Sequence, residues 1–185
     1  MHNKILNKYN FIKEFDQSHL DKQDKKTIII FRNYNQPIDE ELILTIKNYC
    51  KKKGNKFLIS NNIKLAIKLN LDGAYIPSFN KDKKHLSYSF KKNFILLGSA
   101  HNIFEIKIKE NQNISKIFLS PLFKTAKKKE NLGMYKFMKL AKETKKDVVC
   151  LGGINKNNIK KIKLLKINNI ASISMFQNLL KKYEI

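Results

Sequence analysis

The stretch Val148-Val149-Cys150-Leu151-Gly152-Gly153-Ile154-Asn155 decides the fold of this chain. Its first four residues form a short apolar run of the size of a buried strand. The two glycines predict a tight turn in which the backbone can approach a ligand closely. Apolar residues at helical spacing then predict a helix over Asn157–Lys166. A buried strand that turns into a helix is the unit from which parallel sheets are built.

The same unit recurs along the whole chain. Eight strands are expected, at Phe11–Phe15, Thr27–Phe31, Lys56–Ser60, Gly73–Pro77, Phe94–Gly98, Lys116–Ser120, Val148–Leu151 and Ile170–Ser174. Helices are expected at Asp39–Lys53, where Gly54 is a stop signal, and at Met134–Lys145. Other connections are short, for example Asn62–Leu69 and Asp82–Lys92. The pattern predicts an α/β fold, a compact (β/α)8 TIM barrel with several shortened outer helices.

Length and composition predict one domain over residues 1–185. The longest apolar runs are strand-sized, well short of the roughly 20 residues that cross a bilayer. Met1–Phe15 contains neither the apolar region nor the cleavage site of a secretory leader. We therefore expect a soluble, cytoplasmic protein without a membrane partner. Cys50 and Cys150 are far apart and lie in no metal-binding pattern, which predicts two buried thiols.

The net charge of +23 raises the question of nucleic-acid binding. Lysine is spread over nearly every segment, so we interpret the charge as a solvated surface and do not expect a nucleic-acid partner. A nucleic-acid-binding surface is the alternative interpretation. Arg32 is the only arginine. Because a guanidinium offers a planar, bidentate fork that lysine lacks, Arg32 is a candidate anion ligand.

A phosphate site is expected at the end of the seventh and eighth strands. Barrels often bind phosphate in the loops after these strands, and helix starts offer unpaired N–H groups. Gly152 and Gly153 close the seventh strand, and Ser174 ends the eighth. An ordinary tight turn is the alternative interpretation of the glycine pair.

Two further segments follow predicted strands. Gly98-Ser99-Ala100-His101 with Glu105 offers a hydroxyl and an imidazole that titrates near neutral pH. The alternative is that His101 only neighbours a helix N-cap. Ser120–Thr125, followed by Lys127 and Lys128, is suited to a lid over a diphosphate or is an ordinary solvated loop.

Taken in order, these segments resemble the thiamine phosphate synthase and TenI family over about residues 11–176. The matching pieces are Ser60-Asn61-Asn62 with Leu65-Ala66, Asp72-Gly73, Gly98–His101 with Glu105, Ser120–Thr125, Gly152–Asn155 and Ala171–Ser174. The resemblance implies a barrel that joins an aminopyrimidine diphosphate to a thiazole phosphate, with magnesium holding the departing diphosphate. Its partners would be small phosphorylated ligands, and a homo-oligomer is left open.

By position, the resemblance assigns roles to individual residues. It implies thiazole-phosphate contacts for Gly153, beside Gly152, and for Ser174, Thr125 and Lys127, and pyrimidine or diphosphate contacts for Arg32, Ser99 and Lys128. Ser60 stands at another substrate-binding position, and Arg32, Lys128 and His101 are the candidate catalytic residues.

The departures from the family concern the metal end. Asn61 and Asn80 occupy the two positions where the family has metal-binding aspartates, and an amide is a poor ligand for Mg²⁺. We therefore expect a weak or absent magnesium site. Tyr34, Tyr75 and Phe79 stand where the family usually has other polar residues. We therefore expect this half of the pocket to differ from that of the family.

Three functions of the ligand site at the barrel mouth remain open at this point. The first is a synthase in which Arg32 and lysines stabilise the leaving diphosphate. The second is a TenI-like aminothiazole tautomerase, although Pro121 stands at its catalytic histidine and only His101 lies nearby to substitute. The third is a non-catalytic barrel that binds a phosphorylated ligand.

Overall fold

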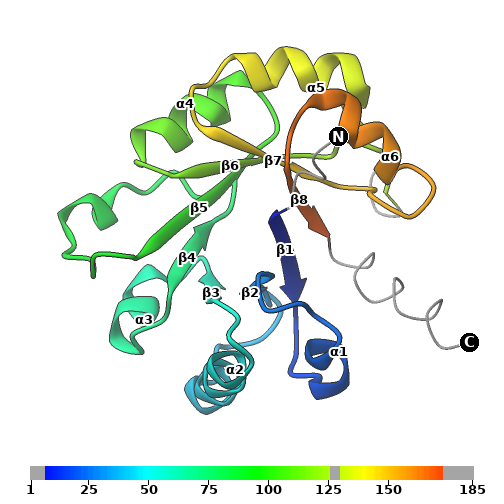
Figure 1. Cartoon of the computed structure of the whole chain (residues 1–185). Helices are drawn as coiled ribbons and strands as arrows, with labels where there is room; N and C mark the ends of the chain where they lie inside the picture. The colour runs from blue at the N-terminus through cyan, green and yellow to red at the C-terminus, as the bar shows by residue number, and fades with distance from the viewer. Residues whose placement is uncertain (1–6, 126–129, 173–185) are drawn as a thin grey trace, which may run out of the picture.

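The computed structural model describes residues 7–125 and 130–172. Eight parallel strands form a closed barrel in chain order, and β8 pairs with β1 (Figure 1). The strands are β1 (Asn7–Ile12), β2 (Ile28–Phe31), β3 (Phe57–Ser60), β4 (Gly73–Ile76), β5 (Ile95–Ala100), β6 (Lys116–Leu119), β7 (Asp147–Leu151) and β8 (Asn169–Ser172). This arrangement confirms the predicted (β/α)8 barrel.

The connecting helices lie outside the ring of strands (Figure 1). They are α1 (Gln17–Asp21), α2 (Glu40–Lys53), α3 (Ile63–Lys68), the 3₁₀ helix η1 (Lys84–Ser87), α4 (Ile103–Asn111), α5 (Gly133–Lys142), α6 (Ile159–Ile162) and the 3₁₀ helix η2 (Lys163–Leu165). Several have only one or two turns, as the short connections predicted. Within the described ranges, no helix has both the length and the apolar character needed to cross a membrane.

The predicted first strand, 11–15, was placed too late in the chain. Residues 11–15 contain the apolar Phe11, Ile12 and Phe15, but β1 is Asn7–Ile12, because Tyr9 pairs with Ile28 of β2 and with Ala171 of β8. Pairing on both sides decides which residues form the strand, and local apolar content does not.

The predicted helix at 157–166 was also too long. Asn155 Oδ1 accepts hydrogen bonds from the backbone N–H groups of Asn157 (2.9 Å) and Asn158 (3.2 Å). Such side-chain-to-backbone bonds favour a turn over a helix. α6 therefore begins only at Ile159 and passes into η2 at Lys163. α5, predicted to end at Lys145, ends at Lys142.

Aromatic rings fill the centre of the barrel. Phe118 makes edge-to-face contacts with Tyr9, Phe11 and Tyr75, at centroid distances of 5.0, 5.9 and 5.3 Å. The rest of this inner cluster is aliphatic: Ile30, Leu58, Leu97, Val149, Leu151 and Ala171. A second apolar cluster lies between the strands and the helices, and it contains both cysteines as buried free thiols.

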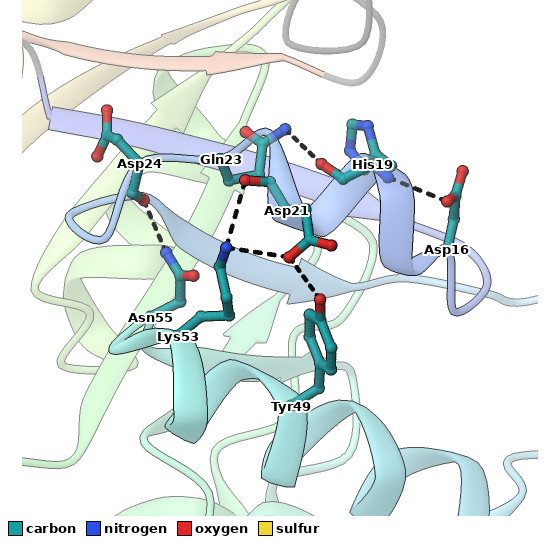
Figure 2. A network of polar contacts seen from close by, with 8 residues as sticks. All are labelled: Asp16, His19, Asp21, Gln23, Asp24, Tyr49, Lys53 and Asn55. Carbon is teal, nitrogen blue, oxygen red and sulfur yellow. Dashed lines mark hydrogen bonds and ion pairs between the residues drawn. The ribbon is translucent and has the colours of Figure 1, made fainter.

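A polar network joins α1 to the end of α2 (Figure 2). Asp21 on α1 accepts hydrogen bonds from Tyr49 Oη (2.5 Å) and Lys53 Nζ (3.0 Å) of α2. Buried Asn55 donates to the carbonyl of Asp24 (2.8 Å). These contacts hold α1 in place, and with it His19, which faces β1.

Candidate functional site

The carboxyl ends of all eight strands open at one mouth of the barrel, because all strands are parallel. Side chains alternate along a strand, so a residue two positions after an interior one also faces inward. Arg32 follows Ile30 in this way, Ser60 follows Leu58, and Ser99 follows Leu97. The structure thus brings three of the predicted site residues together.

Arg32 is the charged member of this group. Its guanidinium carbon is 4.6 Å from the centroid of the Phe11 ring, within the range of a cation–π contact. Its backbone N–H donates to the carbonyl of Ile12 at 2.8 Å. No carboxylate forms an ion pair with Arg32 within residues 7–125 and 130–172. The guanidinium is therefore available to an anion.

Two tyrosines surround Arg32 and engage the predicted serines. Tyr34 Oη and Ser60 Oγ share a hydrogen bond of 2.6 Å. Tyr75, which is fully buried, lies close to Ser99, and this contact opposes the rise in the pKa of the phenol. Burial raises the pKa of both phenols, while Arg32 acts in the opposite direction, so both hydroxyls stay protonated at neutral pH. They can donate to a ligand or to each serine.

An aromatic pair stands at the rim above Ser60. The rings of Tyr34 and Phe79 meet edge to face at 5.6 Å, and both are substantially exposed. The pair connects the loop after β2 with the loop after β4. This half of the mouth thus has an aromatic wall, and the expectation that it departs from the family stays a prediction.

Asn61 and Asn80, which the resemblance assigned to the family's aspartate positions, are hydrogen-bonded to each other. Asn80 Nδ2 donates to Asn61 Oδ1 at 2.7 Å, and Asn80 Oδ1 accepts from the backbone N–H of Asp82 at 2.8 Å. Each amide oxygen therefore already faces a donor. Within the described residues no group of three His, Cys, Asp or Glu side chains could hold a metal ion. This donor set does not fit Mg²⁺, which prefers charged oxygen ligands.

Behind this amide pair lies an open cleft of about 280 Å³. Its walls come from the start of α3 and from η1, and are Asn61, Asn62, Ile63, Lys64, Asn80, Asp82, Lys84, His85 and Tyr88. Asp82 supplies its only carboxylate, and this accepts from the backbone N–H of Lys84 at 2.7 Å.

The glycine pair after β7 lies directly against the loop after β6. Gly152 and Gly153 have φ of +96° and +67°. A Cβ on Gly153 would be 2.3 Å from the carbonyl oxygen of Lys124, and one on Gly152 would be 2.7 Å from Pro121. Phe123 N–H donates to the carbonyl of Gly152 at 3.0 Å. The tight-turn interpretation is therefore sufficient to explain both glycines, and phosphate binding there remains a proposal.

His101 is held at the start of α4. Glu105 Oε2 accepts from the backbone N–H of His101 at 2.7 Å and lies 3.4 Å from the ring Nδ1. The N-cap Asn102 accepts from Glu105 N–H at 2.9 Å. This arrangement matches the helix-cap alternative, and a catalytic role for His101 stays a prediction.

The remaining predicted ligands lie in or beside the loop after β6 and at the end of β8. Thr125 is half-buried in that loop. Lys127, Lys128 and Ser174 fall outside the described residues.

Three buried polar residues near the site were not anticipated from the sequence. Lys109 and Gln112 on and after α4 are 0% exposed, and His85 is 3% exposed. The only signal in the sequence was spacing: Lys109 lies three residues after buried Ile106, on the core-facing side of the helix. Among so many surface lysines this signal is easily missed.

Comparison with other proteins shows the family to which the chain belongs. A family profile described as thiamine monophosphate synthase matches residues 16–176. A thiamine-phosphate synthase of Helicobacter pylori (strain J99 / ATCC 700824) is 27% identical over 164 residues, covering 82% of this chain and 74% of that protein. One of Prochlorococcus marinus is 29% identical over 153 residues, covering 80% of this chain and 44% of that protein. The chain spans less than half the length of the Prochlorococcus marinus relatives it matches.

Solved structures share the fold. A thiamine phosphate pyrophosphorylase from Pyrococcus furiosus superimposes with a TM-score of 0.75 at 20% identity, covering 91% of this chain and 86% of that one. Another from Bacteroides thetaiotaomicron gives a TM-score of 0.60 at 17% identity, covering 98% and 89%. Since the family profile matches most of the chain, the chain belongs to the thiamine monophosphate synthase family.

Proposed function

We propose that this chain is a transferase of the thiamine phosphate synthase type that works without a firmly bound magnesium ion. It would condense a thiazole phosphate with an aminopyrimidine diphosphate. The observation that carries the proposal is Arg32, a guanidinium at the barrel mouth that no carboxylate pairs within the described residues. Family membership supports the chemistry, and the Asn61–Asn80 pair supports its independence from metal.

In this proposal the bond between the pyrimidine methylene and the diphosphate breaks, and the thiazole captures the resulting carbocation. The departing diphosphate gains negative charge, so fixed positive charge near it lowers the barrier. Arg32 is well placed because its stacking on Phe11 fixes the guanidinium before the ligand arrives. Lys127 and Lys128 would add charge from the loop after β6, and Ser99 would contact the pyrimidine.

Gly152, Gly153, Thr125 and Ser174 would hold the thiazole phosphate. Ser60, at the end of the strand beside β2, would contact the substrate through its hydroxyl. His101 is the candidate for any proton transfer. Its contact with Glu105 would then orient the ring.

The test is product formation from the two phosphorylated precursors with pure protein. We expect turnover that survives EDTA and that Arg32→Gln reduces by about two to three powers of ten, the loss typical of one electrostatic contact to a transition state. Lys22→Gln, a change of one exposed charge outside the mouth, is the matched control. Absence of turnover with or without magnesium rejects the proposal.

A second candidate is a barrel that binds a phosphorylated thiazole without catalysis. The hydrogen-bonded amide pair, standing where carboxylates would be needed, favours it. Calorimetry separates the two functions, since a binder takes up thiazole phosphate and ignores the pyrimidine diphosphate. A tautomerase would instead interconvert aminothiazole isomers and lose activity in His101→Gln.

A further inference from the structure

The loop after β4, residues 77–83, is bound on the side that faces α4 by the buried ammonium group of Lys109. Lys109 Nζ donates to the carbonyls of Pro77 (2.8 Å) and Asn80 (2.7 Å) and to Gln112 Oε1 (2.8 Å). The side chain is 0% exposed. Its three protons thus have three acceptors, two of them on the backbone of this loop.

Gln112 extends the contact along the same loop. Its Nε2 donates to the carbonyls of Asn80 (3.1 Å) and Asp82 (2.8 Å), and its own backbone carbonyl lies 2.8 Å from His85 Nε2. Lys109 and Gln112 therefore bind one short segment at Pro77, Asn80 and Asp82. All of these contacts with the loop are to backbone carbonyls, so they fix the path of the loop regardless of its side chains.

The upper side of the same loop forms part of the mouth. Asn80 donates to Asn61, and Phe79 contacts the Tyr34 ring. Asn80 thus has its carbonyl bound to Lys109 and its side chain bound to the loop after β3. A change in the position of the Asn80 backbone would shift both mouth contacts at once.

Burying a lysine at this position costs free energy unless its charged group makes compensating hydrogen bonds. A buried cation loses its hydration, and only close acceptors compensate for that loss. Desolvation lowers the pKa of Lys109 to about 8, while the carboxylate of Glu105 raises it. The group is therefore charged at neutral pH, with all three donors present. An apolar side chain of similar length would fill the space without holding the loop.

We propose that Lys109 is a positioning residue that fixes the loop after β4, and through it the Asn61–Asn80 amide pair and the Tyr34–Phe79 ring pair. The inference rests on the proposed function only in taking the mouth as the ligand site. It assigns to α4, on the outside of the barrel, control over one wall of the mouth.

Hydrogen exchange tests this positioning without any turnover. In Lys109→Met, which keeps the aliphatic stem, amides in residues 77–88 should exchange about tenfold faster or more, as expected when buried acceptors lose a charged donor. Amides of β6 and β7 should keep their rates. Lys107→Met is the control, because Lys107 lies on the same helix but is exposed. Equal acceleration in all strands, or no change in 77–88, overturns the proposal.

A spectroscopic signature and a rescue distinguish positioning from general stability. The side-chain NH₂ resonance of Asn80, assigned by its loss in Asn80→Ala, should shift in Lys109→Met toward that of a free amide. Lys109→Ala should recover the native resonance with propylammonium, which replaces the deleted atoms, and not with 1-propanol. If Lys109→Met does not fold, Gln112→Leu is measured by the same criteria. Rescue by propanol as well as by the amine would reduce Lys109 to a space-filling residue.

Because none of these measurements requires substrate, they succeed or fail independently of the transferase assay.

Discussion

Asn80 and Asn61 join the loops after β4 and β3 through a hydrogen bond of 2.7 Å between Asn80 Nδ2 and Asn61 Oδ1. Asn61 adopts φ of +61°, a left-handed conformation that asparagine tolerates better than most residues. Its backbone N–H also donates to the carbonyl of Tyr75 at 2.8 Å. The two side chains are close enough that carboxylates in their place would share one cation.

Replacing both residues by aspartate should therefore make the thermal stability of the chain depend on Mg²⁺. Without metal, Asn61→Asp with Asn80→Asp places two like charges together and should lower the melting temperature. With Mg²⁺ at about a hundredfold its dissociation constant, binding should stabilise the fold by about 2.7 kcal/mol. Thermal melts with magnesium and with EDTA measure this difference. The parent chain is the control, and an equal response of both proteins to magnesium would contradict the prediction.

Gly153 should tolerate no side chain. Gly153→Ala adds the strain of φ +67° to a Cβ only 2.3 Å from a backbone oxygen. We expect a loss of about 2–4 kcal/mol, since overpacking alone costs about 1–3 kcal/mol and a left-handed alanine about 1 kcal/mol more. Urea denaturation gives the value. Gly133→Ala separates the two effects, because its φ is +64° but the nearest atom is 3.9 Å away. Equal losses in the free energy of unfolding at both positions would mean that the loop after β6 moves away to make room for the new Cβ.

The bond between Tyr34 and Ser60 should appear as a coupling energy. Tyr34→Phe and Ser60→Ala each remove one partner of the 2.6 Å hydrogen bond. In a double-mutant cycle on the free energy of unfolding, we expect coupling of about 0.5–1.5 kcal/mol, the usual net value for one hydrogen bond. A cycle pairing Tyr34→Phe with Ser99→Ala is the control, because the hydroxyl of Tyr34 bonds to Ser60 and Ser99 lies beside Tyr75 instead. Additive losses in the first cycle would indicate that the hydroxyls do not interact.

Stability should fall in mild acid because of His19. Its Nε2 lies 2.7 Å from Asn10 Nδ2, and burial lowers the pKa of His19 below 6.5. The unfolded chain therefore binds a proton at a pH where the folded chain does not. It follows that the free energy of unfolding decreases as pH drops below about 6.5, toward the folded pKa.

Urea denaturation at about pH 7.5 and about pH 5, on either side of the unfolded pKa, measures this loss. His19→Gln, which cannot gain a proton, should show a smaller difference between the two pH values. An unchanged difference would assign the acid sensitivity to other groups.

The sequence alone could place a residue at the mouth where a local apolar pattern marked the end of a barrel strand. Arg32 could be placed at the mouth because a strand of apolar residues ends just before it, and the structure has it there. That Asn61 and Asn80 stand in place of the family's aspartates was inferred from the resemblance and stays a prediction. That the two amides bind each other could not be inferred, because it depends on how two loops approach in space.

Other features were hidden by composition or set by distant contacts. Lys109 looks like one more surface lysine, and only the packing of α4 against β5 and the bonds to the loop after β4 remove it from water. β1 was misplaced because its limits depend on β2 and β8. His19 has no informative neighbours in sequence, whereas in space it faces Asn10.

The four rings of Tyr9, Phe11, Tyr75 and Phe118 seal the barrel immediately beneath Arg32. A ligand of Arg32 would thus meet aromatic rings on one side and would have to approach the guanidinium from the other side. The apolar rings also exclude water from one face of the guanidinium, and a weaker local dielectric response strengthens its attraction for an incoming anion. Selectivity at such a mouth would belong to the surrounding loops, so new ligands could be accommodated by changing loop residues while the strands stay the same.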